Sequence, residues 1–201
     1  MIFIFLSICS LLFGFNSKDL LRDLNMHDEW VEIIRQDDGK IIYQLDTKKK
    51  KYIKIEKEFS FTPRNALLVV QSIEDYNKII SNDNIDTRLI KRDNDTLFVS
   101  QIIRNAIPFL SDRQYIFKMY KVGESRVDWY VLNENDYSDI KYLHDTAHIL
   151  TFGAGSWKVN NNNLIYKIYM DDEVNLPSYI IDNIRTENII SIFEDVINNL
   201  D

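Results

Sequence analysis

The fold is decided by the stretch that runs from Gly153-Ala154-Gly155-Ser156-Trp157 to Leu176-Pro177-Ser178-Tyr179-Ile180-Ile181. A strand that carries two glycines and then a tryptophan is followed by a polar turn, a second strand and a long final helix. In that helix Ile184, Ile189 and Phe193 recur at helical spacing, so one apolar face must be buried. This order predicts a curved antiparallel sheet that wraps around a C-terminal helix. Such an arrangement can enclose a cavity, and a cavity predicts a ligand.

The upstream sequence supplies the rest of the sheet. A first helix is expected over residues 17–34 with Ser17 as its cap, and a second begins at Thr62-Pro63 and carries an apolar stripe from Ala66 to Tyr76. Strands are expected at 40–45, 52–61, 86–91, 96–104, 114–122, 126–132, 147–159 and 164–170. Because most links between them are short and polar, the sheet is expected to be an antiparallel meander.

The composition fits one globular domain. The chain has 201 residues, 45% of them hydrophobic and 12% aromatic, which is enough to build a sizeable core. The formal net charge of -7 argues against nucleic acid as a partner, because phosphate binding favours a basic surface. The lysine run at 48–51 could contact anionic lipid headgroups during transient membrane contact, but a solvated hairpin tip is the favoured interpretation.

The N-terminus carries an uninterrupted apolar run, MIFIFLSICSLLFGF, over residues 1–15. As a helix it would span roughly 22 Å, which is short of the roughly 30 Å hydrocarbon core of a bilayer. Residues 1–17 are therefore predicted to be a signal peptide, which implies export to the periplasm or the medium; a hydrophobic anchor in the cell envelope is the alternative. Cys9 is the one cysteine and lies inside this segment, so the mature chain would have no thiol chemistry.

Several motifs, taken in order, resemble the START lipid-transfer domain of the helix-grip (SRPBCC) superfamily over most of residues 18–201. They are Gly39-Lys40-Ile41-Ile42-Tyr43, Pro108-Phe109-Leu110-Ser111-Asp112-Arg113, Gly155-Ser156-Trp157 and the acidic turn at 171–172 that leads to Pro177. Glu173-Val174-Asn175 replaces the glycines usual in that turn. The resemblance implies an α+β helix-grip fold with a deep apolar cavity for one lipid or other hydrophobic molecule, closed by the C-terminal helix.

Two arginines are candidates for contact with a ligand headgroup. The planar guanidinium of Arg113 suits an oxyanion at a cavity rim, although a structural pair with Asp112 is the favoured interpretation. Arg104 and Gln101 lie on an otherwise apolar strand. Either one would anchor a ligand if it faced inward, whereas an outward orientation is favoured for both.

The remaining ligand-binding candidates are apolar and aromatic. Tyr115 and Phe117 are expected on the cavity wall, and Trp157 is expected either to stack on the ligand or to pack in the core. The lid candidates lie on the final helix, and they are Tyr179, Ile180, Asn183 and Ile184.

No pattern indicates catalysis, a metal or a cofactor. The histidines His27, His144 and His148 lack metal-binding spacing, and no nucleophile elbow or phosphate loop is present. Binding of a hydrophobic ligand, and its transfer as a finer step, is therefore the predicted function. The alternatives are a helix-grip enzyme, such as a cyclase or hydrolase acting on a small hydrophobic substrate, and an interaction module with a filled core.

Overall fold

The computed structural model describes residues 16–47, 50–104, 111–133, 136, 144–171 and 177–200, with the backbone alone described at 178–180. The apolar run at 1–15 lies outside these residues, so the predicted signal peptide stays a prediction. No helix in the described ranges combines the length and the apolar character that crossing a membrane requires.

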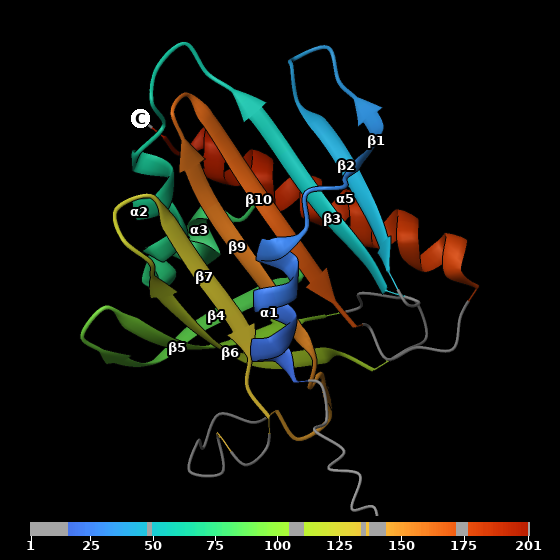
Figure 1. The fold of residues 1–201 in the computed structure, drawn as a ribbon. Coiled ribbons are helices and arrows are strands. Elements are labelled where there is room, and N and C mark those ends of the chain that lie inside the picture. The colour runs from blue at the N-terminus through green and yellow to red at the C-terminus, as the bar shows by residue number, and fades with distance from the viewer. Residues whose placement is uncertain are drawn as a thin grey trace, which may run out of the picture.

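One highly curved sheet dominates the fold (Figure 1). Its path is β1-β2-β3-β10-β9-β7-β6-β5-β4, and every neighbouring pair along that path is antiparallel. The short β8 lies off this path and pairs with β6 in parallel. The strands are β1 (Val31–Arg35), β2 (Ile41–Thr47), β3 (Lys50–Glu58), β4 (Ile85–Asp93), β5 (Thr96–Ile103), β6 (Arg113–Lys121), β7 (Arg126–Val131), β8 (His148–Ile149), β9 (Gly153–Asn160) and β10 (Asn163–Met170).

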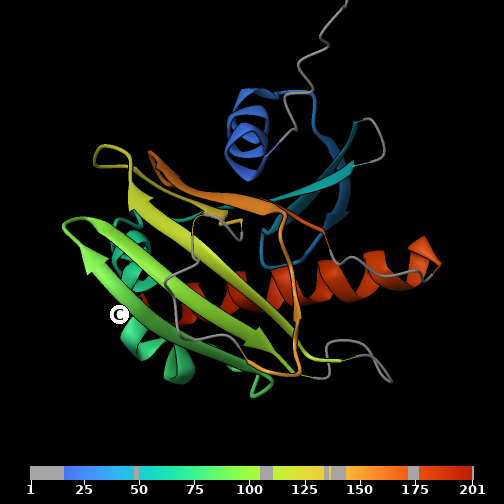
Figure 2. The same cartoon turned by 90° about the horizontal axis from the view of Figure 1, so that it is seen from below.

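Helices cover both faces of the sheet. The long α5 (Ser178–Asn198) crosses the concave inner face, together with α2 (Asn65–Gln71), the 3-10 turn η1 (Ile73–Asp75) and α3 (Tyr76–Ile79) (Figure 2). The opposite, outer face carries α1 (Ser17–Met26) (Figure 1). A curved antiparallel sheet that holds a C-terminal helix confirms the predicted α+β helix-grip fold.

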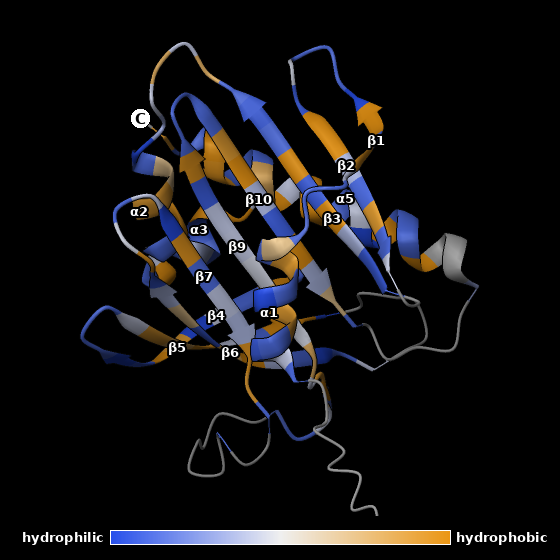
Figure 3. Cartoon of the chain, in the orientation of Figure 1, coloured by the Kyte–Doolittle hydropathy of each residue, from blue (hydrophilic) through white to orange (hydrophobic). Residues whose placement is uncertain are grey.

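Strand alternation decides which side chains meet α5. Along β9 the odd positions Trp157 and Val159 face inward, whereas Ser156 and Lys158 face outward, as the two-residue period of a strand requires. The C-terminal half of α5 supplies the matching apolar face, with Ile189, Phe193 and Val196 buried. In Figure 3 hydrophobic residues, in orange, alternate with hydrophilic ones along the strands and recur on α5.

Ion pairs fix α5 to one side of the sheet. The Lys40 ammonium, which is almost fully buried, contacts Glu194 of α5 and also pairs with Asp38. Nearer the start of the helix, Lys51 of β3 pairs with Asp182. These contacts attach the terminal helix to the β2–β3 side of the sheet.

The first helix is shorter than predicted. It ends at Met26, and the residues from Val31 form β1 instead of extending the helix. Asn16 is the cap, because its side-chain oxygen accepts from the backbone N–H of Asp19 at 2.9 Å. The hydroxyl of Ser17, the expected cap, bonds instead to the Thr151 carbonyl and the Gly153 N–H. The helix thus begins with a contact to the β8–β9 link.

The second predicted helix is present, but it is interrupted. Arg64, and not Thr62, occupies its N-cap position, and the α-helix stops at Ser72. There the hydroxyl of Ser72 donates to the carbonyl of Leu68 at 2.9 Å, a local bond that competes with helix continuation. The predicted strand over 147–159 is likewise split, into β8 and β9. The predicted apolar stripe from Ala66 to Tyr76 is nevertheless buried throughout.

Candidate ligand-binding site

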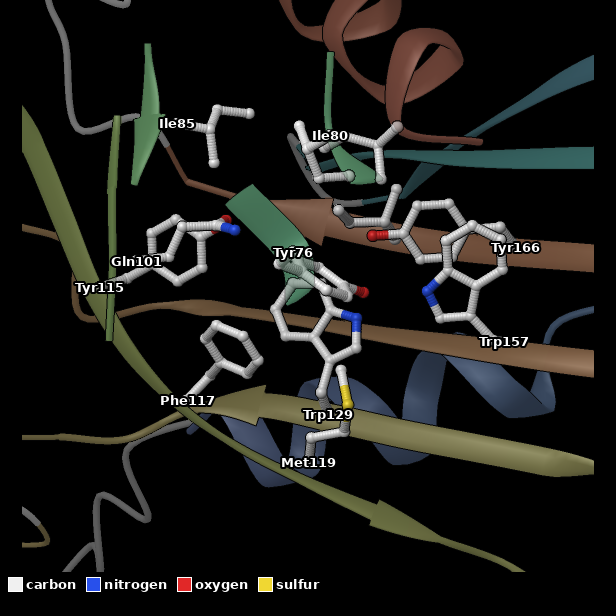
Figure 4. A pocket seen from close by; sticks show the side chains of 12 residues that line it. Tyr76, Ile80, Ile85, Gln101, Tyr115, Phe117, Met119, Trp129, Trp157 and Tyr166 are labelled. Atoms are coloured by element: carbon white, nitrogen blue, oxygen red, sulfur yellow. The ribbon is translucent and has the colours of Figure 1, made fainter. Parts of the chain in front are cut away.

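A pocket lies between the inner face of the sheet, the α3–β4 link and α5 (Figure 4). Its volume is about 50 Å³. Eleven of its twelve lining residues are buried, and Ile192 of α5 is half-buried. The lining consists of Tyr76, Ile80, Ile85, Gln101, Tyr115, Phe117, Met119, Trp129, Trp157, Tyr166, Ile168 and Ile192, and we call this set the inner pocket.

The inner pocket is small for a ligand site. A volume of about 50 Å³ holds a few water molecules, whereas pockets for organic ligands usually measure about 300–1,000 Å³. The deep cavity that the START resemblance implies therefore stays a prediction. A larger occupant would have to displace lining side chains, and Ile192 is the least buried of them.

Aromatic stacking forms one wall of the inner pocket. The Trp157 ring is nearly parallel to Tyr166, with centroids 3.9 Å apart, and nearly parallel to Phe193 of α5, with centroids 5.7 Å apart. On the neighbouring strands Phe117 meets Trp129 at 5.6 Å in a tilted arrangement. Trp157 thus joins β10 to the terminal helix while its edge lines the pocket.

A polar row crosses the otherwise apolar pocket. Thr87, Gln101 and Tyr115 are direct partners on β4, β5 and β6. The Gln101 amide donates to the Thr87 hydroxyl at 2.6 Å and accepts from the Tyr115 phenol. Since all three residues are buried, the row satisfies polar groups that would otherwise be costly to bury.

The phenols in the pocket remain neutral. Burial raises the pKa of Tyr76, Tyr115 and Tyr166 well above the ordinary value near 10. A hydrogen bond with Trp129 offsets part of the rise in the pKa of Tyr166. At neutral pH these groups can donate or accept hydrogen bonds, and none of them is a phenolate base.

We expect Gln101→Leu to lower the free energy of unfolding by about 1–3 kcal/mol, because it leaves the buried hydroxyls of Thr87 and Tyr115 without their partner. Urea denaturation measures the change. Gln44→Leu is the matched control: the Gln44 amide bonds to Asp46 at the surface, and its loss should cost less than about 0.5 kcal/mol. Equal effects of the two substitutions would contradict a stabilising polar row.

Two hydrogen bonds also fix the α3–β4 link beside the pocket. Both the backbone N–H and the hydroxyl of Ser81 donate to the buried Asp195 carboxylate of α5, at 2.9 and 3.1 Å. This link carries the lining residues Ile80 and Ile85 at its two ends. The terminal helix therefore positions that wall of the pocket.

Three of the predicted site residues line the inner pocket, namely Tyr115, Phe117 and Trp157. The arginines lie elsewhere. Arg104 forms an ion pair with Asp86 at 2.9 Å, and the guanidinium of Arg113 donates to the Ser111 carbonyl at 2.9 Å, which favours a structural role. The bond to Ser111 is one contact that holds Arg113, and the predicted pairing with Asp112 stays a prediction.

The lid candidates on α5 lie at the other end of the helix from the pocket. Asn183 is exposed and Ile184 is half-buried, and neither belongs to the pocket lining. The side chains of Tyr179 and Ile180 are outside the described residues. Ile192, two turns after Ile184, is the side chain through which α5 contributes to the inner pocket.

Gln101 is the polar pocket residue that sequence reasoning placed on the wrong face. The signal was available, because Leu97, Val99 and Gln101 share one side of a strand by the two-residue period. The place of Tyr76 was harder to predict: the helical stripe predicted its burial, but the α-helix ends before Ser72 and Tyr76 begins the separate helix α3. Met119, Tyr166 and Ile168 also line the pocket.

Within the described ranges no group of three or more His, Cys, Asp or Glu residues could hold a metal ion. The described polar groups of the pocket are amides, indoles and neutral phenols. Its geometry suits hydrogen bonding to a mostly apolar molecule.

The arrangement described above is the helix-grip fold of START, or StAR-related lipid-transfer, domains. A STAR-related lipid transfer protein from Xanthomonas axonopodis aligns with a TM-score of 0.66 and 12% identity over 86% of this chain and 99% of its own. Human STARD10 aligns with a TM-score of 0.64 and 12% identity over 91% of this chain and 79% of its own.

The same fold also occurs in an enzyme. The Zhui aromatase/cyclase from Streptomyces sp. R1128 aligns with a TM-score of 0.54 and 8% identity over 74% of this chain and 92% of its own. Such identities establish the fold and leave the activity open. Neither a family model nor a curated protein sequence matches the chain.

Proposed function

We propose that this chain binds a hydrophobic ligand in the inner pocket, between the curved sheet and α5. The observation that carries the proposal is a void walled by buried apolar and aromatic side chains on the concave face of a START-type fold. Apolar contact would supply the affinity, at about 25 cal/mol for each Å² of apolar surface removed from water.

The polar row defines what the ligand would carry. Gln101 and Tyr115 are the two residues of this row on the lining, and each already bonds to a neighbour. A ligand with one hydroxyl or carbonyl group could replace one of those bonds, whereas a charged group would find no ionised side chain among the described lining residues. The proposed ligand therefore has a neutral polar end on an apolar body, and it binds without forming a covalent bond.

The first experiment identifies an occupant. The purified full chain is extracted with organic solvent and the extract is analysed by mass spectrometry, and native mass spectra are recorded after fatty acid, phospholipid and sterol are offered. We expect one apolar molecule per chain. A chain that carries none and takes up none of the three would contradict the proposal.

A bulky side chain at the pocket should block uptake. We expect Ile192→Trp to weaken ligand binding about tenfold or more, because the indole would occupy a void of about 50 Å³. Titration with the ligand identified above measures the loss. Ile184→Trp makes the same change on the same helix away from the lining and should bind normally, and equal losses in both variants would place the ligand elsewhere.

Transfer between membranes and action outside the cytoplasm extend this proposal. The predicted export segment at 1–17 supports the second extension. A donor–acceptor vesicle assay with the identified lipid tests the first, and a transfer rate no higher than the rate without protein would restrict the function to binding.

A further inference from the structure

The outer face of the sheet holds a second recess, remote from the inner pocket. Its volume is about 240 Å³, several times that of the inner pocket. It lies where the end of α1 and the following segment meet β3, β7, β9 and β10, on the face toward the viewer in Figure 1. The lining, which we call the outer recess, consists of Asn25, Asp28, Trp30, Lys54, Arg126, Ser156, Lys158, Ile165 and Lys167.

Like charges face one another across the strands of the outer recess. Lys54 and Lys167 are direct partners on β3 and β10, and Arg126 and Lys158 are direct partners on β7 and β9. Like charges directly opposite on a sheet are destabilising. Two such pairs side by side, in a chain whose net charge is -7, indicate that the cations serve a purpose other than folding.

The neighbouring carboxylates neutralise part of this charge. Lys54 pairs with Glu56, and Arg126 pairs with Asp128, both at 3.2 Å. Asp28 is the one carboxylate among the described residues of the lining. Among the described residues no carboxylate forms an ion pair with Lys158 or Lys167, so two cations remain available to an incoming anion.

The Lys167 ammonium is half-buried and weakly held. Its hydrogen bonds to the carbonyls of Leu24 and His27 are long, at 3.4 and 3.5 Å. Burial and then the charge of Lys54 lower the pKa of Lys167, with smaller contributions from Lys158 and Arg126, and Asp28 opposes the shift. An anion in the outer recess would relieve this repulsion.

Trp30 adds an aromatic surface to the cations of the outer recess. Its ring lies 5.4 Å from the Lys167 ammonium and 5.8 Å from that of Lys54, and its indole N–H is engaged with the His27 carbonyl at 2.9 Å. The ring is therefore held close to both cations. A compact anion placed against it would contact both ammonium groups at once.

We propose that the outer recess binds a phosphate-type oxyanion, recognised by Lys54, Lys158 and Lys167 with Arg126 beside them. The volume accommodates a single phosphate group and a small substituent. Inorganic phosphate and the phosphate headgroup of a lipid share this chemistry. The site is independent of the hydrophobic ligand proposed for the inner pocket, on the other face of the sheet.

The three tryptophans make the test self-controlled, because Trp30 lines the outer recess while Trp129 and Trp157 line the inner pocket. The full chain, labelled with nitrogen-15, is titrated with sodium phosphate and separately with sodium chloride at equal ionic strength. We expect phosphate to shift the indole signal of Trp30 in a saturable way and to leave the other two unchanged.

Variants connect that response to the cations. Lys158→Ala removes an exposed lysine and Lys167→Met removes the half-buried one, and each should weaken the phosphate response about tenfold, the usual scale for losing one charge-assisted hydrogen bond. Lys118→Ala, on β6 of the same face but outside the recess, should respond as the unmodified chain does. Because Lys167 also bonds to the Leu24 carbonyl of α1, its replacement would remove a contact to that helix. Lys158→Ala makes no such change and tests the proposal by itself.

Vesicles separate the two sources of phosphate. Phosphatidylcholine vesicles with and without phosphatidic acid are offered to the chain and to Lys158→Ala. Capture that requires phosphatidic acid and Lys158 assigns the site to a headgroup, and a saturable response to free phosphate assigns it to a soluble anion. No response to either, or responses unchanged in both lysine variants, would overturn the proposal.

Discussion

Trp157→Ala is expected to lower the free energy of unfolding by about 3–5 kcal/mol, the range for truncating a large buried aromatic residue. Trp157 is 2% exposed and stacks on Tyr166 of β10 and on Phe193 of α5. Its removal would leave a void between the sheet and the terminal helix. Because domains of this size are stable by about 5–15 kcal/mol, much of the total would be lost.

Urea denaturation followed by circular dichroism measures the loss. Trp157→Phe keeps an aromatic ring between Tyr166 and Phe193 and should cost clearly less than the alanine variant, so the comparison remains informative even if Trp157→Ala does not fold. Equal costs for Ala and Phe would show that the stack contributes nothing beyond filled space. The identified ligand should also bind more weakly to the alanine variant, since one wall of the inner pocket is gone.

Gly155→Ala is expected to cost about 3 kcal/mol, at the upper end of the range for overpacking a core. A Cβ at Gly155 would lie 2.5 Å from Nε1 of Trp129 and less than 3 Å from two further indole atoms. The two residues are direct partners on β9 and β7, so the indole lies flat against the backbone of Gly155. The indole of Trp129 is a rigid ring system, so it cannot move away from the added Cβ by rotating a terminal bond.

The same strand supplies the control. Gly153→Ala places a Cβ 2.5 Å from the sulfur of Met170, but a methionine side chain is flexible and can move aside, so the cost should be well below that of Gly155→Ala. In a double-mutant cycle, Trp129→Leu should remove most of the penalty of Gly155→Ala. A penalty that persists after the indole of Trp129 has been replaced would refute the contact as its cause.

Much of the fold was accessible from the sequence because strand and helix periods report burial directly. The alternation along β9 and β10 and the apolar face of α5 predicted the core layer, and the Gly-x-Trp motif predicted a strand in its centre. Gly155 now has a physical role in that motif: the missing Cβ is what allows Trp129 to reach the pocket.

The errors have local causes that periodicity does not encode. Residues 17–34 read as one helix because Trp30, Val31 and Ile34 continue the spacing of α1, yet pairing with β2 is available to them and takes precedence. Ser17 was expected to cap that helix, but its hydroxyl bonds to the Thr151 carbonyl and the Gly153 N–H, which lie far away in the sequence. Neither partner is visible in a single sequence.

The small volume of the inner pocket has a kinetic consequence under the proposed function. A void of about 50 Å³ admits a lipid only in conformations where side chains such as Ile192 have moved, and those conformations are a minority of the ensemble. The apparent affinity is then reduced by the open fraction, and the observed uptake rate levels off at high ligand concentration because opening becomes the slow step. Release is limited in the same way, so a loaded chain would retain its cargo longer than the affinity alone suggests.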